Sequence, residues 1–530
     1  MRLAIKEEED EVKSSRCLAA FLALSLVAAV AFAGCGGGGT AETTSSNELR
    51  LALAEAPAPL DPDTFYEANG TIITGAVYER LLQYKPNSPK LAPMLATSWK
   101  VSPDGKKYTF GLREGVKFSD GTPFDAAAAK ASLERRTALE GGPSYMLENV
   151  ASYETPDEST LVVNLKEPQV PFLDYLASPF GPAMTSPTTI KKEEKNGDHA
   201  AAWLGSHSAG TGPYVLSEAD QGVRYTLTPN KYFWGKKPAF ETVSFTVVPD
   251  PETQRLQLEG GTLDAVLGGL TTKDDEALEA SGKVDVYHFP ALLKAAVWVN
   301  PESPVFGSPE VRQALRESLD NTELTKQVYG KRAEPSTEAY PPGMLPKGAA
   351  PDEPKLDPAK LEAALAPYKG DEIVIGWWAD SATRDLANLL QVKLHELGLN
   401  ASVHQYSGAE TFTMAEKPSL RPDLFAITLN PDAVAADTWA RIYWRTGAPV
   451  NMLGCSVPAA DKLLDEASRQ TSKARSEELG VEAAEQYMAS NCWLNIADVY
   501  DTIAVRKGLT GIVHQLPWLG AIELAAVRPE

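Results

Sequence analysis

Residues 91–124 have the sequence LAPMLATSWKVSPDGKKYTFGLREGVKFSDGTPF, in which short apolar alternations flank a turn signal. Trp99 alternates with polar neighbours before Asp104-Gly105, and Tyr108 and Phe110 alternate with polar or small residues after it. A period of two on both sides of a turn whose residues tolerate positive φ predicts a β-hairpin. We expect its aromatic side chains to be core residues of a scaffold.

Other segments of the chain show the periods of strands and helices. Ser308-Pro309-Glu310 combines a helix cap, a proline at the first helical position and a first-turn carboxylate. The predicted elements are a strand over 48–53, helices over 125–136 and 309–319, and a β-α-β unit formed by a strand at 373–378, a helix over 386–397 ending at Gly398, and a strand at 401–406. Strands and helices in both halves, without a visible tandem repeat, indicate an α/β protein with two lobes.

The composition excludes several classes of function. The 530 residues include 71 acidic and 50 basic side chains, giving a net charge of -21. So negative a chain repels phosphate backbones, so nucleic-acid binding is not expected. Phosphate-loop, dinucleotide-loop, zinc-protease and serine-hydrolase motifs are absent, and the six histidines are scattered. We therefore predict no enzyme activity, no catalytic residue, no cofactor and no metal site.

The N-terminal region has the pattern of an export signal. An uninterrupted apolar or small stretch spans residues 17–34, and Phe32-Ala33-Gly34-Cys35 resembles the cleavage box of bacterial lipoproteins. We expect a signal peptide over 1–34, lipidation of Cys35 and a flexible tether over 35–47. An uncleaved membrane anchor is the alternative. In both cases the globular part lies outside the cytoplasm, at the cell membrane.

Two of the four cysteines lie in the globular part. Cys455 and Cys492 would be the remaining pair in an oxidising compartment once Cys17 leaves with the signal and Cys35 is acylated. We predict a disulfide between them, with two buried free thiols as the alternative.

The hairpin region and several later stretches closely resemble one protein family, the extracellular solute-binding proteins of family 5. These proteins are peptide, nickel and opine receptors of ABC importers. The matching stretches are Leu91–Trp99, Val101–Gly105, Tyr108–Phe110, Leu112–Phe118, Asp120–Phe124, Gly210–Tyr214, Asn230–Trp234, Gly260–Asp264, Pro309–Leu315 and Leu394–Leu399.

The resemblance implies a two-lobed fold of the type II periplasmic-binding class, in the large peptide-binding form with a ligand cleft between the lobes. Lobe I would comprise residues 48–293 and 502–530, with a subdomain at about 76–205, and lobe II residues 294–501. The chain would cross between the lobes near residues 293 and 501, and ligand binding would close the lobes.

The resemblance also suggests which residues bind the ligand. Peptide-binding members hold the ligand's ammonium with a carboxylate and its carboxylate with an arginine. Arg384 matches the arginine's position, while Asp432 and Asp437 compete for the carboxylate's role because the spacing around residues 430–439 departs from the family pattern. The aromatic candidates for the cleft are Phe65, Tyr66, Trp378 and Trp439.

These observations predict a monomeric, membrane-tethered lipoprotein that captures a small solute and delivers it to an ABC permease. An oligopeptide is the foremost candidate. An oligosaccharide or a metal chelate remains open as the solute, and so does a surface sensor or chaperone-like protein that is not coupled to import.

Overall fold

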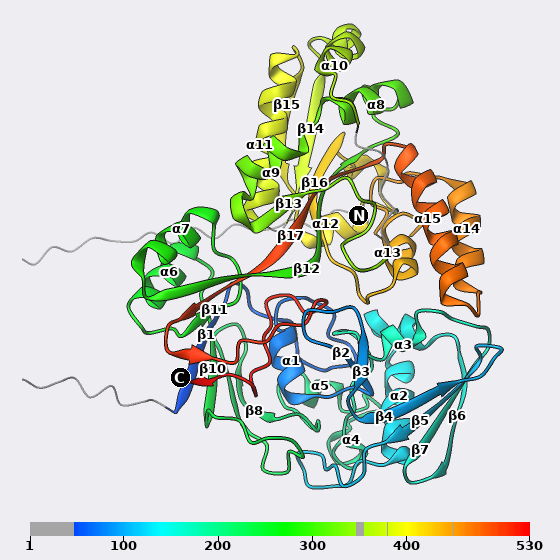
Figure 1. Cartoon of the computed structure of the whole chain (residues 1–530), viewed down its shortest axis with the longest axis vertical. Coiled ribbons are helices and arrows are strands. Elements are labelled where there is room, and N and C mark those ends of the chain that lie inside the picture. The colour runs from blue at the N-terminus through cyan, green and yellow to red at the C-terminus, as the bar shows by residue number, and fades with distance from the viewer. Residues whose placement is uncertain (1–46, 346–353, 379, 449) are drawn as a thin grey trace, which may run out of the picture. The chain divides into compact units, whose positions relative to one another are not determined.

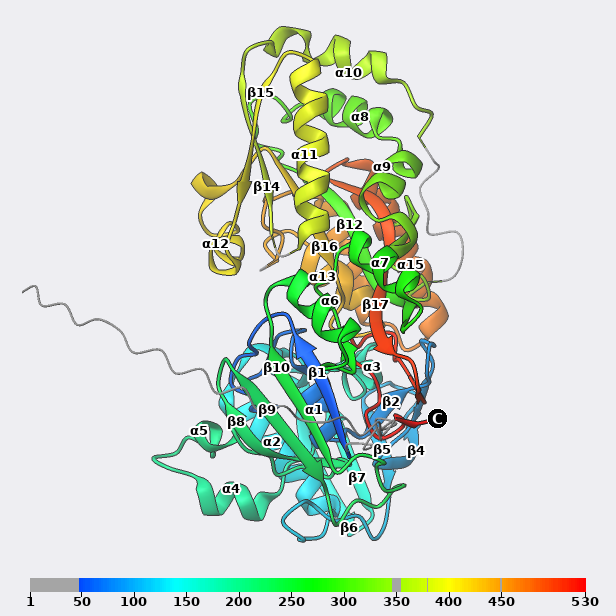
Figure 2. The same cartoon turned by 90° about the vertical axis from the view of Figure 1, so that its left-hand side faces the viewer.

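Two long antiparallel strands, β12 (Val284–Val299) and β17 (Trp493–Arg506), run through the middle of the largest sheet (Figures 1 and 2). The computed structural model describes residues 47–345, 354–378, 380–448 and 450–530. The predicted signal peptide, nearly all of the tether, and Cys35 lie outside these ranges. We call residues 47–293 and 502–530 lobe I, and the described residues of 294–501 lobe II.

The largest sheet has eleven strands and continues from one lobe into the other. Its order is β15-β14-β16-β12-β17-β11-β1-β10-β9-β8, and β13 pairs with β17. The register between β12 and β17 shifts between Phe289 and Leu293. The two lobes are therefore connected by one pair of long strands with an irregularity near its middle.

In lobe I, β1 pairs in parallel with β10 and β11, and β8, β9 and β10 form an antiparallel meander. The two faces of this half of the sheet bury separate hydrophobic clusters, one of which includes residues of α1 and the other residues of α6 and α7. The bounds are β1 (Glu48–Leu53), β8 (Tyr214–Asp220), β9 (Arg224–Pro229), β10 (Thr242–Val247), β11 (Ala265–Val266), α1 (Thr71–Val77), α6 (Pro251–Glu259) and α7 (Thr272–Ser281). Shorter elements are β2 (Leu82–Tyr84), β3 (Leu91–Pro93), α3 (Phe172–Tyr175), α4 (Pro187–Glu193), α5 (Ala201–Leu204), β18 (Leu509–Thr510) and β19 (Arg528–Pro529).

The predicted hairpin is confirmed. It forms β4 (Ala96–Val101) and β5 (Lys107–Leu112), in which Trp99 pairs with Phe110, and Gly105 in the turn has a φ of 67°. With β7 (Thr160–Leu165) and β6 (Val150–Asp157) the hairpin makes a four-stranded sheet, against which α2 (Ala126–Leu139) packs. Tyr108, Phe110 and Phe118 are buried and Trp99 is half-buried, so the signature aromatics belong to the scaffold.

Lobe II contains the predicted β-α-β unit, because β14 pairs in parallel with β15 and the two are connected by α11. Its strands are β13 (Ala333–Pro335), β14 (Glu372–Trp377), β15 (Asn400–Gln405) and β16 (Leu424–Leu429). Its helices are α8 (Pro309–Ser318), α9 (Asn321–Val328), α10 (Pro358–Leu365), α11 (Ser381–Glu396), α12 (Gly408–Thr413), α13 (Ala436–Tyr443), α14 (Pro458–Ser468) and α15 (Lys473–Ala489). Helices α8–α11 share a core with one face of the sheet, and α13–α15 share a core with the other.

The side chains at the helix starts explain where two of the predicted helices begin. Asp125 accepts a hydrogen bond from the backbone N–H of Ala128 at the start of α2, and Ser308 accepts one from Val311 at the start of α8. These are N-cap bonds, which satisfy amides that have no partner within the helix.

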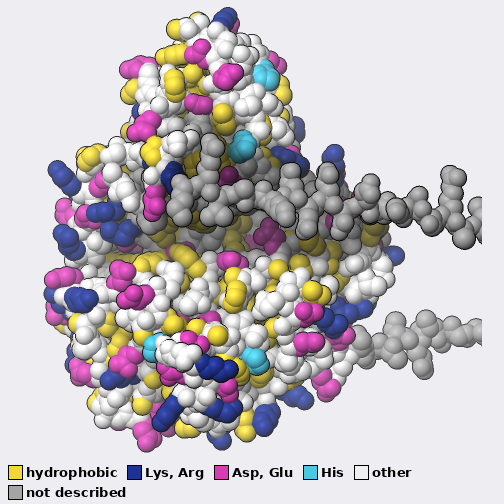
Figure 3. Space-filling view, turned by 180° about the vertical axis from the view of Figure 1, so that it is seen from behind, with side chains coloured by type: hydrophobic (Ala, Val, Ile, Leu, Met, Phe, Trp, Pro, Cys, Tyr) yellow, Lys and Arg dark blue, Asp and Glu magenta, His cyan; other side chains and the backbone are white. Residues whose placement is uncertain are grey.

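The surface and the helices agree with a globular protein of mixed charge. Acidic and basic side chains are interspersed over the face shown in Figure 3. Over the ranges that the structure describes, the helices are too short or too polar to cross a membrane.

Candidate ligand-binding site

Most of the predicted ligand residues follow two neighbouring strands of lobe II, whereas Phe65 and Tyr66 belong to lobe I. Strands β14 and β16 are parallel, with Trp377 opposite Ala426, so their carboxyl ends lie at the same edge of the sheet. Trp378 and Arg384 follow β14, and the segment 430–437 follows β16. In α/β sheets, ligands bind at the carboxyl ends of the strands, so this edge is the natural place for a site.

Asp432 is buried and is held by hydroxyl groups of lobe I. Its Oδ2 accepts a hydrogen bond from the hydroxyl of Tyr145 at 2.6 Å and another from the hydroxyl of Tyr66. The hydroxyl of Ser178 donates to the backbone oxygen of Asp432. Among the described residues, Asp432 makes no ion pair with a cation. Burial raises the pKa of Asp432, and the bonds from the two tyrosines only partly oppose this effect.

Aromatic rings position the two tyrosines. Tyr66 packs edge-on against Phe180 with the ring centroids 5.1 Å apart, and Tyr145 packs in the same way against Tyr175 at 5.8 Å. Gly142 leaves room for Tyr66, because a Cβ there would lie 2.7 Å from Cδ1 of that ring. Although 39% of Tyr66 is exposed, its hydroxyl is committed to Asp432.

Asp437 has a different environment. Its carboxylate forms an ion pair with Arg441, one turn later on α13, at 2.8 Å, and Arg441 also contacts Asp465 at 3.2 Å. The charge of Asp437 is thus already neutralised by a neighbour on its own helix.

Arg384 lies in the first turn of α11. The helix is capped by Asp380, whose side chain accepts a hydrogen bond from the N–H of Thr383 at 2.8 Å. The side chain of Arg384 is half exposed and contacts the adjacent Asp385 at 3.2 Å. Among the described residues, no hydrogen bond or ion pair connects Arg384 to Asp432. The arginine is therefore accessible from solvent.

The aromatic candidates occupy different positions. Trp378 is half-buried and packs against Phe412, whereas Trp377 packs with the core on the opposite face of the sheet, as expected for adjacent strand residues. Phe65 is buried in the core of lobe I. Trp439 is 1% exposed and packs against Tyr443 and Trp444, so a ligand would reach it only after the core rearranges.

A second contact between the lobes involves Arg332, at the end of the short 3₁₀ helix η2 (Gly330–Arg332). Its guanidinium forms an ion pair with Asp275 of α7 and donates to the backbone oxygens of Leu270 and Thr271. A cavity of about 470 Å³ adjoins this contact and is lined by residues of both lobes, including His288 and Thr325.

Cys455 and Cys492 are joined by a disulfide in the structure, with an S–S distance of 1.99 Å. The bond connects the segment before α14 to the start of β17. It lies on the same side of the sheet as the core that contains Trp439 and Trp444.

Sequence reasoning did not identify Tyr145 or Ser178. Tyr145 lies in the 3₁₀ helix η1 (Gly142–Leu147), and both residues reach Asp432 only through the tertiary fold. The nearby sequence GGPSY contains turn residues, but no pattern in it indicates a ligand site.

Two lobes of α/β structure connected by a pair of long strands are the fold of the type II periplasmic-binding class, and solved structures share this fold. The ABC transporter-associated periplasmic binding protein DppA from Helicobacter pylori, in complex with the peptide STSA, has a TM-score of 0.78 and 22% sequence identity, and the match covers 91% of this chain and 98% of DppA. NikA from Brucella suis, in complex with Fe(III)-EDTA, has a TM-score of 0.80 and 21% identity, and covers 91% and 100%. The predicted fold class is confirmed.

The chain belongs to the bacterial extracellular solute-binding proteins of family 5, whose "family 5 Middle" profile matches residues 90–448. The probable D,D-dipeptide-binding periplasmic protein DdpA of Escherichia coli K12 is 32% identical over 289 residues, or 54% of this chain and 55% of DdpA. The glutathione-binding protein GsiB of Escherichia coli O1:K1 is 29% identical over 354 residues, or 65% and 66% of the two chains. The matches thus span between half and two thirds of these relatives.

Proposed function

We propose that this protein is the solute-binding component of an ABC importer and that it captures a short peptide with a free amino terminus outside the cytoplasmic membrane. Membership of the family supports the binding role. A peptide is favoured over a sugar by two comparisons. The relatives DdpA and GsiB are named for binding a D,D-dipeptide and glutathione, and the Helicobacter protein was solved in complex with a peptide.

The observation that carries the proposal is the state of Asp432. A buried carboxylate is normally paired with a cation or saturated by donors. Here two neutral hydroxyls hold it, and no cation among the described residues contacts it. The ammonium group of a peptide would supply the missing positive charge and form charge-assisted hydrogen bonds. Asp437 does not need a cation from the ligand, because Arg441 already neutralises its carboxylate.

Arg384 would receive the other end of the peptide. Its guanidinium is half exposed at the start of a helix, where the backbone amides also favour an anion. Trp378, on the same edge of the sheet, is half-buried and would cover the peptide between its two charged ends. Together these residues would bind a zwitterionic ligand by opposite charges.

The experiment is isothermal titration calorimetry with trialanine, N-acetyl-trialanine and trialanine amide. Losing one partner of a charge pair in a partly desolvated site costs about 2 to 5 kcal/mol, or about thirtyfold or more in affinity. N-acetylation and Asp432→Asn should each cause such a loss, and acetylation should cause no further loss in the variant. Arg384→Ala should weaken trialanine but hardly affect its amide.

Two controls make the outcome specific. Asp437→Asn should keep its affinity for trialanine, because Asp437 is paired within its helix. Asp432→Asn should keep its melting temperature, since an amide oxygen still accepts from both tyrosines and no charge stays buried. Equal binding of the free and acetylated peptides would contradict the ammonium site. If the wild-type protein bound a neutral oligosaccharide and no peptide, the class of solute would be wrong.

We further propose that the mature protein is a monomer anchored to the outer face of the cytoplasmic membrane by lipid on Cys35, and that it delivers its ligand to a permease. Support comes from the apolar stretch that ends at Cys35 and the Gly/Ser/Thr-rich segment that follows. Cys35→Ser should move the protein from the membrane fraction to the soluble fraction or stop its processing. Unchanged fractionation and unchanged mass would contradict the anchor.

A further inference from the structure

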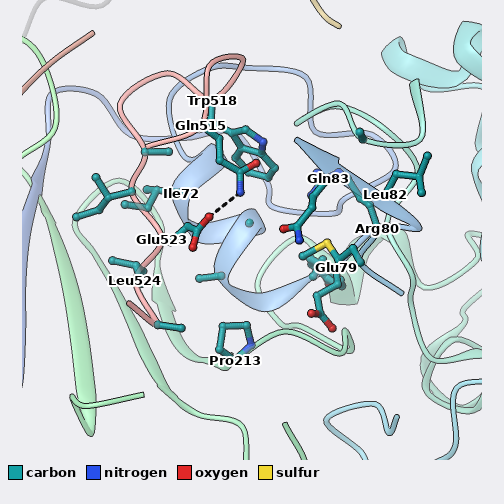
Figure 4. A pocket seen from close by; sticks show the side chains of 18 of the residues that line it. Ile72, Glu79, Arg80, Leu82, Gln83, Pro213, Gln515, Trp518, Glu523 and Leu524 are labelled. Carbon is teal, nitrogen blue, oxygen red and sulfur yellow. Dashed lines mark hydrogen bonds between the residues drawn. The ribbon is translucent and has the colours of Figure 1, made fainter. Parts of the chain in front are cut away.

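Lobe I contains a cavity between two parts of the chain. One part is α1 and the segment that follows it, and the other is residues 515–525 near the C-terminus. Figure 4 shows Ile72, Glu523 and Leu524 on one side, Glu79 and Gln83 on the other, and Gln515 and Trp518 between them. Its volume is about 180 Å³. The side chains that contact Asp432 do not line it, so it is separate from the proposed peptide site.

Most of the wall is apolar. An apolar cavity of about 150 Å³ in another protein holds one benzene molecule, so the space here is large enough for a single ring or a short branched chain. The apolar lining residues include Ile72, Leu82, Met94, Phe233, Ile522 and Leu524.

The cavity contains one buried cation, the guanidinium of Arg80. The residue is 4% exposed, its Nη2 donates to the backbone oxygen of Pro179, and its Nε has no hydrogen-bond partner. Among the described residues, no carboxylate lies within ion-pair distance of it. The carbon of the guanidinium lies 4.8 Å from the centre of the Trp518 ring, which covers it. Burial lowers the pKa of Arg80 to about 9, so the group is still charged at neutral pH.

The two carboxylates of the wall are committed elsewhere. Glu79 accepts hydrogen bonds from the hydroxyl of Thr211 at 2.7 Å and from the indole of Trp234 at 2.8 Å. Glu523 accepts one from the amide of Gln515 at 2.8 Å (Figure 4). Neither carboxylate forms an ion pair with Arg80, so its guanidinium has no anionic partner among the described residues.

We propose that this cavity binds a small monocarboxylate with an apolar body, such as an aromatic or branched-chain acid. The carboxylate would accept hydrogen bonds from the guanidinium of Arg80, and the body would fill the apolar part. Because Trp518 and the apolar wall limit the access of water, the charge-assisted bond is stronger there than at an exposed site.

The probe is sodium benzoate, and its control is benzamide, which has a similar shape without the charge. Calorimetric titration of the wild-type protein at pH 7 should show saturable binding of benzoate, with benzamide at least about tenfold weaker. No saturable binding of benzoate, or equal affinities for the two probes, would overturn the proposal.

Two variants locate the site. Arg80→Met should weaken benzoate at least about tenfold, while Arg224→Met, which removes an exposed arginine that pairs with Glu48, should leave it unchanged. Because Arg80→Met replaces a buried residue and can destabilise the fold, a second variant tests the same space. Ala525→Phe fills the cavity from a half-buried lining position and should also weaken the binding of benzoate. Wild-type affinity in a folded Arg80→Met protein, or in Ala525→Phe, would overturn the assignment. If the wild-type protein did not bind trialanine, the peptide proposal would fail but the benzoate proposal would stand, because the two sites share no residue.

Discussion

Asp432 and Asp437 lie on the same segment, yet their carboxylates have different partners. Asp437 is paired with Arg441 on its own helix, whereas Asp432 accepts only from hydroxyl groups that belong to the other lobe. A carboxylate that keeps its charge while buried and without a cation is costly for the free protein. Such a cost is expected of a binding residue, because the ligand relieves it.

Glu79 provides a prediction at the scale of one residue. It is 2% exposed, and burial raises its pKa to about 7. Its pKa in the unfolded chain is about 4.3. The folded protein therefore binds a proton that the unfolded chain releases, so the stabilisation is fully present below about pH 4 and is lost as the pH rises through 7. Each unit of difference corresponds to about 1.4 kcal/mol.

Glu79→Gln should remove this dependence, because the amide oxygen can accept from Thr211 and Trp234 without carrying a charge. The melting temperature of the variant, measured relative to wild type, should rise between pH 5 and pH 8. Glu218→Gln, on the exposed part of β8, is the matched control and should give a constant difference. A constant difference for Glu79→Gln as well would mean that Glu79 is ionised in the folded protein throughout this range.

At the scale of the element, local sequence predicted the secondary structure well. The alternation around Asp104-Gly105 corresponds to β4 and β5, and the leucine stripe ending at Gly398 corresponds to α11 between two parallel strands. These signals succeed because the period of the side chains and the turn residues act over a few positions.

The candidate site could be predicted only in part. Arg384 and Asp432 were predicted because they match a family motif, and the motif left Asp437 as an equal candidate. Tyr66 and Tyr145 contact Asp432 from 366 and 287 residues away in the sequence. No local period encodes such a contact, because it depends on how two lobes meet. The burial of Trp439 was missed for the same reason.

The disulfide between Cys455 and Cys492 leads to a prediction at this scale. It closes a loop with a sequence separation of 37 residues around α14 and α15. The cross-link lowers the conformational entropy of the unfolded chain, which stabilises the folded protein by roughly 4 kcal/mol at most. The variant with both cysteines changed to serine should lose up to this much free energy of unfolding in urea titrations.

Reduction provides the control for this experiment. A reducing agent should lower the stability of the wild-type protein to that of the double variant and leave the variant unchanged. Thiol labelling of the unreduced, denatured mature protein should find neither cysteine free. Labelling of both residues, with equal stability of the two proteins, would mean that they are free thiols.

At the scale of the whole molecule, β12 and β17 are the only strands in the described part of the chain that pair within both halves of the sheet. Lys294 is fully buried beside the register shift and forms an ion pair with Asp498 at 2.5 Å, which ties the two strands together on the side of lobe II. We expect the lobes to move as bodies about the irregular part, near residues 289–293 and 499–501.

The contacts of Asp432 are among those that join the two lobes without a ligand. Hydrogen bonds to a charged group contribute about 1.5 to 3 kcal/mol each, so losing the hydroxyls of both Tyr66 and Tyr145 should favour an open form in which water solvates Asp432. Small-angle scattering of the ligand-free variant with both tyrosines changed to phenylalanine should therefore give a larger radius of gyration than wild type. Saturating trialanine should reduce that radius, because its ammonium replaces the missing donors. Tyr225→Phe is the control, since its hydroxyl bonds to Gln221 within lobe I, and it should scatter like wild type. Identical radii for the double variant and wild type, with and without trialanine, would show that these hydrogen bonds do not hold the lobes together.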